Sequence, residues 1–343
     1  MRAPGAQALA VSLVLALAAC GTGDDAGSAT DDAGSPAPSS APGATSSGTA
    51  GDGAGGDNPV LADDFPDPDV LEVDGTYYAY ATNGNSRNVR VARSDDLVEW
   101  EELDDALPRL PAYVVPGKTW APEVTRLAPD RYVLYYTATS FRPALQCIGV
   151  AVASAPEGPF EPVGDAMLVC PPEEGGAIDA STFLDADGTQ YLLWKNDGNC
   201  CGLDTWLQLA PLTADGLALA GPPVRLVTQD QPWEGNLVEA PTLVERDGSY
   251  VLLYSANDYG GSAYAIGYAT APAVTGPYTK DPEPLLTTYR DAEYVGPGGQ
   301  DVVVGPDGED RLVFHSWYGQ NTYRAMNVLP LDWQDGRPVV EVD

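Results

Sequence analysis

The chain has 343 residues, with 50 acidic and 17 basic side chains and a formal net charge of −33. This charge excludes an ordinary nucleic-acid-binding protein, because contacts to phosphate need clustered Lys and Arg. A single histidine excludes metal sites built from several histidines, and no apolar run reaches the ~20 residues of a bilayer-spanning helix.

The N-terminus has the pattern of an export signal. Arg2 precedes an apolar run over residues 8–19, which is too short to span a bilayer. The run ends in Leu17-Ala18-Ala19-Cys20, which resembles a bacterial lipobox, in which the cysteine thiol is lipidated. We therefore expect residues 1–20 to be a lipoprotein-type signal ending at Cys20. The alternative is an ordinary cleaved signal with a chance cysteine. Either way the protein is expected outside the cell, held at the membrane only by its lipid or secreted.

Residues 21–57 are predicted to be a disordered linker. The segment contains Gly, Ser, Ala, Thr, Asp and Pro but no aromatic residue and no Leu, Ile or Val. It cannot bury enough apolar surface to offset the entropy lost on ordering. The remainder, residues 58–343, is itself strongly acidic, so we expect a soluble monomer with no polyanionic partner.

Four cysteines follow Cys20. An even number of cysteines in an exported chain suggests disulfides. The four allow three pairings, among which the sequence does not choose: Cys147, Cys170, Cys200 and Cys201. One of the three joins the two adjacent cysteines to each other.

A hairpin turn followed by a strand rich in aromatic and aliphatic residues recurs five times in residues 58–343. The turns begin at Asp74, Asp130, Asp187, Asp247 and Asp307, with spacings of 56, 57, 60 and 60 residues. In four of them Gly follows the Asp, and Asp-Gly between apolar runs predicts a tight hairpin because glycine accepts a positive φ. Each unit offers three to four strands, and five radial sheets can cover one another's apolar faces. We therefore predict an all-β, five-bladed β-propeller over 58–343, with a two-sheet sandwich as the alternative.

The strand before each hairpin is expected to be the innermost of its blade. Equivalent positions at the start of these strands should then meet at one end of the central channel, and counting back from the hairpins gives Asp67, Ala121, Asp179, Glu239 and Gly299. Three of the five are acids. Crowded carboxyls raise one another's pKa and mark a cation site or an acid–base pair. Any one of them alone would be interpreted as a solvated surface acid, so the hypothesis depends on all three.

Short motifs on these strands make the chain resemble glycoside hydrolase family 43. The motifs are Phe65-Pro66-Asp67-Pro68-Asp69, Trp120-Ala121-Pro122-Glu123, Ile178-Asp179-Ala180-Ser181, Val238-Glu239-Ala240-Pro241 and Gly296-Pro297-Gly298. The resemblance implies an inverting hydrolase of O-glycosyl bonds. It implies that Asp67 is the general base, that Glu239 is the general acid, and that Asp179 raises the pKa of the acid and orients it. An inverting site needs a gap of about 6.5 to 9.5 Å between its two carboxyls to admit a water.

The resemblance also implies a substrate class. The family acts mainly on plant polysaccharides that contain arabinose or xylose, so α-L-arabinofuranosidase, β-xylosidase and endo-arabinanase activities are all compatible. Substrate contacts are expected from Phe65, Trp120, Gln300 and His315, since aromatic faces stack on sugars. Packing in the core is the alternative for the two aromatic residues, and a hydrogen-bonded strand histidine is the alternative for His315.

No cofactor is implied, and a structural Ca²⁺ is an open alternative. Many members of the family carry a histidine near a central calcium, after the fifth-blade Gly-Pro-Gly. This chain has Gly299-Gln300 there, and its histidine lies on the next strand.

Two other functions remain to be weighed. One is a retaining five-bladed enzyme acting on fructans, but the Asn-Asp-Pro and Arg-Asp-Pro motifs of those enzymes do not occur in this sequence. The other is a propeller that binds carbohydrate, or a protein partner, without catalysis.

Overall fold

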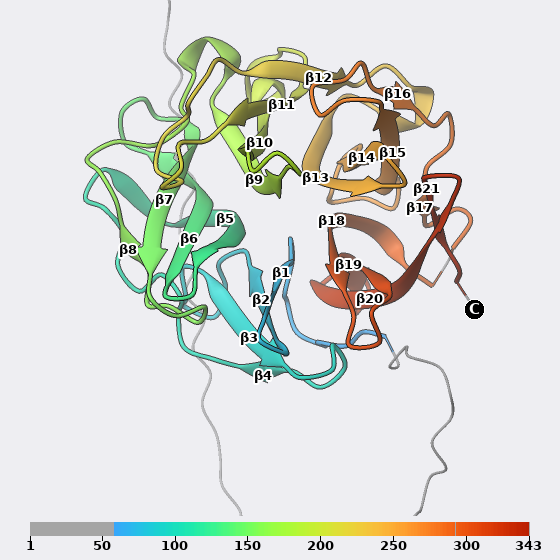
Figure 1. Cartoon of the computed structure of the whole chain (residues 1–343), viewed down its shortest axis with the longest axis horizontal. Coiled ribbons are helices and arrows are strands. Elements are labelled where there is room, and N and C mark those ends of the chain that lie inside the picture. The colour runs from blue at the N-terminus through green and yellow to red at the C-terminus, as the bar shows by residue number, and fades with distance from the viewer. Residues whose placement is uncertain (1–57, 292, 343) are drawn as a thin grey trace, which may run out of the picture. The chain divides into compact units, whose positions relative to one another are not determined.

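Each predicted turn connects the first two strands of an antiparallel sheet, and five such sheets surround a central channel (Figure 1). The computed structural model describes residues 58–291 and 293–342, and these form the five-bladed β-propeller predicted above. The predicted signal, Cys20 and the linker lie outside the described residues.

The blades follow one another in chain order. Blade 1 contains β1 (Asp69–Val73), β2 (Thr76–Ala81), β3 (Arg90–Ser94) and β4 (Glu101–Glu102). Blade 2 contains β5 (Val114–Ala128), β6 (Arg131–Ser140), β7 (Gln146–Ala153) and β8 (Glu161–Pro162). Blade 3 contains β9 (Ala177–Leu184), β10 (Gln190–Asn196), β11 (Trp206–Pro211) and β12 (Val224–Thr228). Blade 4 contains β13 (Val238–Arg246), β14 (Ser249–Ala256), β15 (Ala265–Ala271), β16 (Thr279–Lys280) and β17 (Leu286–Thr287). Blade 5 contains β18 (Val295–Val304), β19 (Asp310–Tyr318), β20 (Tyr323–Gln334) and β21 (Arg337–Val340). The 3₁₀ helices are η1 (Pro172–Glu174), η2 (Gly198–Cys201) and η3 (Pro232–Glu234).

The strand that precedes each hairpin is the innermost of its blade, as predicted. β1, β5, β9, β13 and β18 each pair with one neighbour in the sheet, and Figure 1 shows them around the central opening. All five run in the same sense along the channel, from its mouth toward the hairpins. The starts of the five strands therefore meet at one end.

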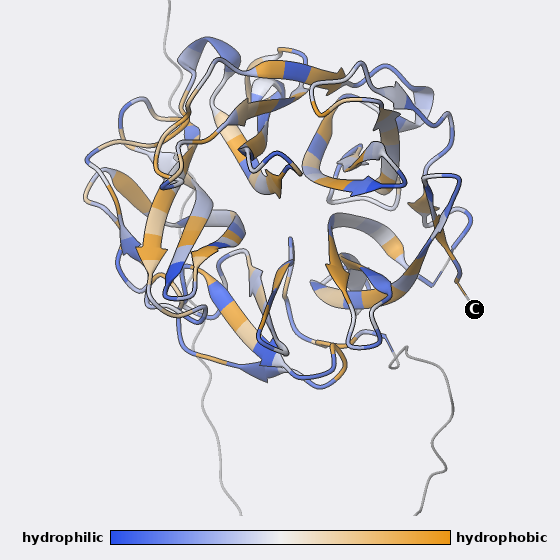
Figure 2. Ribbon diagram, in the orientation of Figure 1, coloured by the Kyte–Doolittle hydropathy of each residue, from blue (hydrophilic) through white to orange (hydrophobic). Residues whose placement is uncertain are grey.

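The hydrophobic core is divided among the interfaces between neighbouring blades. The described residues form five apolar clusters, each built from two adjacent sheets. Tyr80 of blade 1 packs with Leu134 of blade 2, for example, and both are 0% exposed. Figure 2 shows hydrophobic residues along the strands of all five sheets. Because each sheet covers the next, radial packing replaces the two-layer sandwich that was the alternative.

Residues at the start of the propeller close the ring against blade 5. The Asn58 side chain donates to the carbonyl of Val328 (3.0 Å) and accepts from its N–H (2.9 Å). The N–H of Val60 donates to Met326 O, and that of Phe65 donates to Arg324 O. The first blade is thereby joined to the last by hydrogen bonds between segments far apart in sequence.

Two disulfides select one of the three pairings left open by the sequence. Cys147 on β7 bonds to Cys170, and Cys200 bonds to its neighbour Cys201 in η2. Among residues 58–291 and 293–342, no helix is both long and apolar enough to cross a membrane.

Candidate active site

The channel mouth is built from the same three-residue turn in every blade. Its first residue has a positive φ in each case: Asp67 (54°), Ala121 (39°), Asp179 (55°), Ala240 (49°) and Gly299 (57°). Such a conformation is costly for a residue with a side chain, and it persists where the surroundings enforce it. These residues and the two that follow each of them line a cavity at the centre of the propeller.

The equivalence shows that one sequence-based alignment was wrong. Ala240, and not Glu239, occupies the position of Asp67 and Asp179 in the ring. In blades 1 to 5 the first turn residue precedes its hairpin aspartate by 7, 9, 8, 7 and 8 positions. The count of 8 used for blade 4 is therefore one too many, and it reached Glu239. Glu239 therefore lies one step before the ring and has partners of its own.

Asp67 contacts one neutral donor, one cation and solvent. Its Oδ2 accepts a hydrogen bond from the Thr82 hydroxyl (2.7 Å), and its Oδ1 lies 3.5 Å from Nη1 of Arg324. The Asp67 side chain is 23% exposed, so solvent reaches it. A carboxylate with one neutral donor, one nearby cation and access to water can take a proton from a water molecule.

His315 is neutral and accepts a hydrogen bond from the backbone of Asp67. Its Nδ1 accepts a hydrogen bond from the backbone N–H of Asp67 (3.1 Å), which leaves the proton on Nε2. The ring is 0% exposed and stacks on Tyr264 at 6.0 Å. Burial, with a contribution from Arg324, lowers the pKa of His315 well below its usual value. His315 thus orients the turn at Asp67 and is not directed at open solvent.

Glu239 receives two donors, neither of which the sequence analysis identified. Lys195 Nζ lies 2.9 Å from Oε2, and the Tyr264 hydroxyl donates to Oε1 at 2.9 Å. Burial lowers the pKa of Lys195, but the charges of Glu239 and Asp179 outweigh burial and raise it above the usual value. Lys195 is therefore a buried cation, and it faces two carboxyl groups.

The pKa of Asp179 is influenced by both of the other acids, Glu239 and Asp67. Burial raises its pKa to about 8; Glu239 adds to the increase, Lys195 opposes it, and Asp67 makes a smaller contribution of the same sign as Glu239. Its Oδ2 accepts a hydrogen bond from Ala240 N (3.0 Å), the residue next to Glu239. Asp179 consequently touches the backbone that carries Glu239, and the two carboxyls share a strongly coupled environment.

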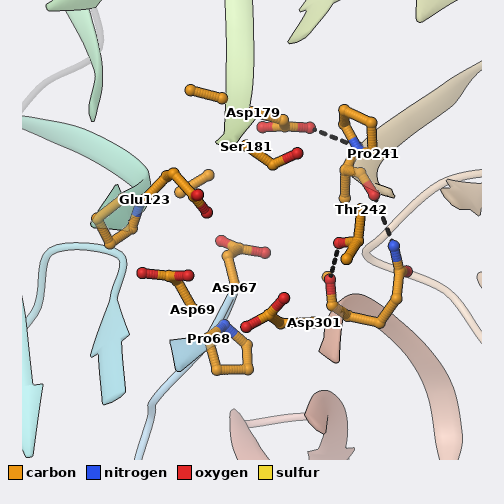
Figure 3. A pocket seen from close by; sticks show the side chains of 15 residues that line it. Asp67, Pro68, Asp69, Glu123, Asp179, Ser181, Pro241, Thr242 and Asp301 are labelled. Atoms are coloured by element: carbon orange, nitrogen blue, oxygen red, sulfur yellow. Dashed lines mark hydrogen bonds between the residues drawn. The ribbon is translucent and has the colours of Figure 1, made fainter. Parts of the chain in front are cut away.

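A second group of acids lies deeper in the channel and was missed as a group. Asp69, Glu123 and Asp301 occupy the third position of the turn in blades 1, 2 and 5, and Figure 3 shows their carboxyls around the cavity below Asp67. Each accepts a hydrogen bond from the following blade: Asp301 from Val70 N, Asp69 from Val124 N and Glu123 from Thr182 N. The sequence contained a signal for this group, because the third turn residue is Asp, Glu, Ser, Thr and Asp in blades 1 to 5.

Burial raises the pKa of each of the deeper acids. Burial, then Glu123 and Asp301, raises the pKa of Asp69 well above its usual value. Burial likewise raises the pKa of Glu123 to about 8, with Asp301 adding to the shift, and that of Asp301 to about 6. The cavity that these residues line has a volume of about 40 Å³, and Asp67 and Asp179 line it as well.

The remaining predicted contact residues have different positions. Phe65 is 0% exposed in the cluster between blades 5 and 1, with the Arg90 guanidinium over its ring, so it is removed from the surface that a sugar could touch. Gln300 is 4% exposed; it lines the cavity and bonds to Ser255 Oγ and Ala240 O. Trp120 is partly exposed on β5 beside Lys118.

In the part of the chain that the structure describes, no group of three or more His, Cys, Asp or Glu side chains is arranged to hold a metal ion. Gln300, which replaces the histidine that accompanies calcium in many similar sequences, uses both ends of its amide within the protein. Two carboxyls and a water provide what hydrolysis of an acetal requires without a cofactor.

Comparisons with known proteins agree with this geometry. The family model described as "Glycosyl hydrolases family 43" matches residues 56–338. A β-D-galactofuranosidase (xynD) of Aspergillus niger is 28% identical over 294 residues, which are 80% of each chain. An extracellular endo-α-(1→5)-L-arabinanase of Bacillus subtilis is 27% identical, over 79% of this chain and 86% of its own. The crystal structure of a thermostable family-43 glycoside hydrolase is 31% identical, has a TM-score of 0.74, and covers 83% of this chain and 96% of its own.

Proposed function

Because the chain belongs to glycosyl hydrolases family 43, we propose that it is an inverting glycosidase of arabinose- or xylose-containing plant polysaccharides and oligosaccharides. The first choice is α-L-arabinofuranosidase or β-xylosidase activity. Similar proteins include a xylosidase/arabinosidase of Humicola insolens, 29% identical over 75% of this chain. Hydrolysis of an O-glycosyl bond is the common chemistry of these proteins.

In the proposed reaction Asp67 is the general base. Its carboxylate removes a proton from a water molecule as the water oxygen bonds to the anomeric carbon of the sugar. The bond from that carbon to the leaving oxygen breaks, and Glu239 gives its proton to this oxygen. One water is consumed, and the configuration at the anomeric carbon inverts because attack comes from the face opposite the leaving group.

The protonation required by this scheme is supported by Asp179. A general acid must hold a proton at the working pH, and the raised pKa of Asp179, about 8, keeps a proton next to Glu239 that the two carboxyls can share. Lys195 balances the negative charge that remains on the pair. Asp179 is thus proposed to keep the acid side of the site protonated, while Asp67, beside Arg324 on the other side, is proposed to act as the base.

One observation carries the proposal: three acids from three blades interact at one channel mouth, yet each has a different environment.

Purified enzyme should release nitrophenol from 4-nitrophenyl α-L-arabinofuranoside or β-D-xyloside. Asp67→Asn and Glu239→Gln are nearly isosteric and should each lose at least ~10³-fold in kcat while keeping the wild-type Tm. NMR of the first product formed should show the inverted anomer. Wild-type turnover in either variant would refute the assigned roles.

Endo-arabinanase activity is the second candidate, and the names of similar proteins favour it. Arabinanases of Bacillus subtilis and Thermotoga petrophila are 27–30% identical to this chain. Linear arabinan distinguishes the two actions, because endo cleavage lowers viscosity before monosaccharide accumulates. The galactofuranosidase resemblance adds an aryl β-D-galactofuranoside to the panel. Binding of these polysaccharides without any product would instead favour a non-catalytic carbohydrate-binding propeller.

The location of the protein is also proposed. The arabinanases named above are extracellular, which supports export, and the lipobox-like sequence supports lipidation at Cys20. The full chain expressed in a bacterium should enter the membrane fraction with a lipid on Cys20 detectable by mass spectrometry, and Cys20→Ser should release it. We further propose that the propeller is a monomer, which light scattering will test.

A further inference from the structure

Two aromatic side chains stand at the edge of the channel mouth, on the side of Asp67. Tyr259 lies in the loop between β14 and β15, and Trp317 lies near the end of β19. They come from neighbouring blades and are separated by 58 residues in sequence. We call Tyr259 and Trp317 the rim platform.

The platform is fixed by contacts between the blades. The indole N–H of Trp317 donates to the carbonyl oxygen of Tyr259 at 2.7 Å. The guanidinium carbon of Arg324 lies 5.0 Å from the ring centroid of Tyr259 and 5.7 Å from that of Trp317. Cation–π contacts of this kind contribute about 0.5–1 kcal/mol each at exposed sites. Both rings are thereby held against one charged group.

The same arginine connects the platform to the site. Arg324 Nη1 lies 3.5 Å from Asp67 Oδ1, and the Arg324 side chain is only 14% exposed. The Arg324 backbone is bonded in both directions to the segment that leads to Asp67: its N–H donates to Asp64 Oδ1 (2.9 Å), and its oxygen accepts from Phe65 N (2.8 Å). The platform therefore lies one arginine side chain away from the proposed base.

The aromatic surface remains open to solvent. Tyr259 is 52% exposed, and Trp317 is partly exposed. An exposed ring fixed in place offers a flat, electron-rich face at little entropic cost, and the C–H groups of a sugar face complement it. Arg324 lies between these rings and Asp67, so a substrate that extends past Asp67 on this side meets them.

We propose that the rim platform binds a second sugar unit of an oligosaccharide, next to the unit whose bond is cut beside Asp67. This inference rests on the proposed function, because it names where the rest of the same substrate binds. Tyr259 and Trp317 then determine the preference for longer substrates. They take no part in bond cleavage, and a substrate with a single sugar does not reach them.

The test compares two substrates of different length in matched variants. For Tyr259→Ala we expect kcat/KM on a pentose trisaccharide to fall at least ~10-fold, mainly through KM, while kcat/KM on the aryl monoglycoside stays within about twofold of wild type. Tyr259→Phe should behave like wild type. Leu184→Ala is the control, since Leu184 is 66% exposed at the hairpin end of β9, away from the mouth.

Equal losses on both substrates, or no loss on either, would overturn the proposal. A measurement of binding affinity distinguishes a failure of this proposal from a failure of the proposed function. Titration calorimetry with the trisaccharide on Glu239→Gln, with and without Tyr259→Ala, requires no turnover. A drop in affinity of at least ~10-fold supports the platform even if wild type cleaves neither substrate, and unchanged affinity contradicts it.

Discussion

The ammonium group of Lys195 lies 2.9 Å from the carboxylate of Glu239, and both side chains are buried, with 1% and 11% of their surfaces exposed. Lys195 comes from β10 of blade 3 and Glu239 from β13 of blade 4. The ion pair therefore crosses the blade interface at the point where the site needs a proton donor. Removing one partner from such a buried pair leaves an uncompensated charge.

The first prediction concerns this pair. Lys195→Met removes the cation that favours the ionised form of the acid, so the acid should keep its proton to higher pH. The alkaline limb of the kcat/KM–pH profile should therefore move to higher pH by about one unit or more. The variant should also lose ~3–5 kcal/mol of stability, visible as a lower Tm. Lys195→Arg is the matched control because it keeps the charge, and an unmoved limb in a folded Lys195→Met protein would contradict the role.

The second prediction is the pH dependence of the wild-type enzyme. The Asp179–Glu239 pair retains a proton until the pH passes the raised pKa of Asp179, about 8. Activity should fall above that pH because the acid has lost its proton, and at low pH because Asp67 becomes protonated. Asp179→Asn removes the carboxyl with which Glu239 shares this proton, so Glu239 should lose its proton at lower pH. The alkaline limb of this variant should move to lower pH, and a limb that stays in place would exclude Asp179 as the modulator.

The third prediction concerns stability and the deeper acids. The pKa of Glu123 is raised from 4.5 to about 8 in the folded protein, so the native state binds more protons than the unfolded chain. The contribution of Glu123 to the free energy of unfolding is complete below about pH 4, and it is lost as the pH rises to about 8. Glu123→Gln mimics the protonated form and keeps an acceptor for Thr182. Its Tm should match that of wild type at pH 4 and exceed it by several degrees at pH 9, and a difference independent of pH would refute the interpretation.

The fourth prediction concerns closure of the ring. The Asn58 side chain makes two hydrogen bonds to Val328 and donates a third to Tyr294 Oη. At about 0.5–1.5 kcal/mol for each bond, Asn58→Ala should destabilise the propeller by ~2–4 kcal/mol in urea unfolding. Asn236→Ala is the control, because the Asn236 side chain is exposed. Equal stability of the Asn58 and Asn236 variants would show that the first and last blades are joined by other contacts.

Much of the architecture could be predicted from local sequence. Asp-Gly turns such as Asp247-Gly248 specify hairpins by their own backbone preferences, and their near-equal spacing indicates repeated blades. The inner strand of each blade follows from its place before the turn. The acids Asp67 and Asp179 were found in this way, because counting from the nearest hairpin reached the correct turn residue.

Other features depended on how the blades pack. The distance from the turn to the hairpin differs between blades, so counting back from Asp247 reached Glu239 in place of Ala240. Lys195 is an ordinary strand residue in the sequence, and its partner lies 44 residues away. The pairing of the four cysteines likewise required the positions of β7 and η2.

The sequence by itself determined five hairpin-led sheets and the acids near the start of three of them, because turn conformation and strand alternation are set by neighbouring residues. Only the tertiary structure decided which charges each acid meets. Those charges arrive from other blades: Lys195 of blade 3 meets Glu239 of blade 4, and Arg324 of blade 5 meets Asp67 of blade 1. Local sequence does not specify such contacts, because they form only when the sheets pack together.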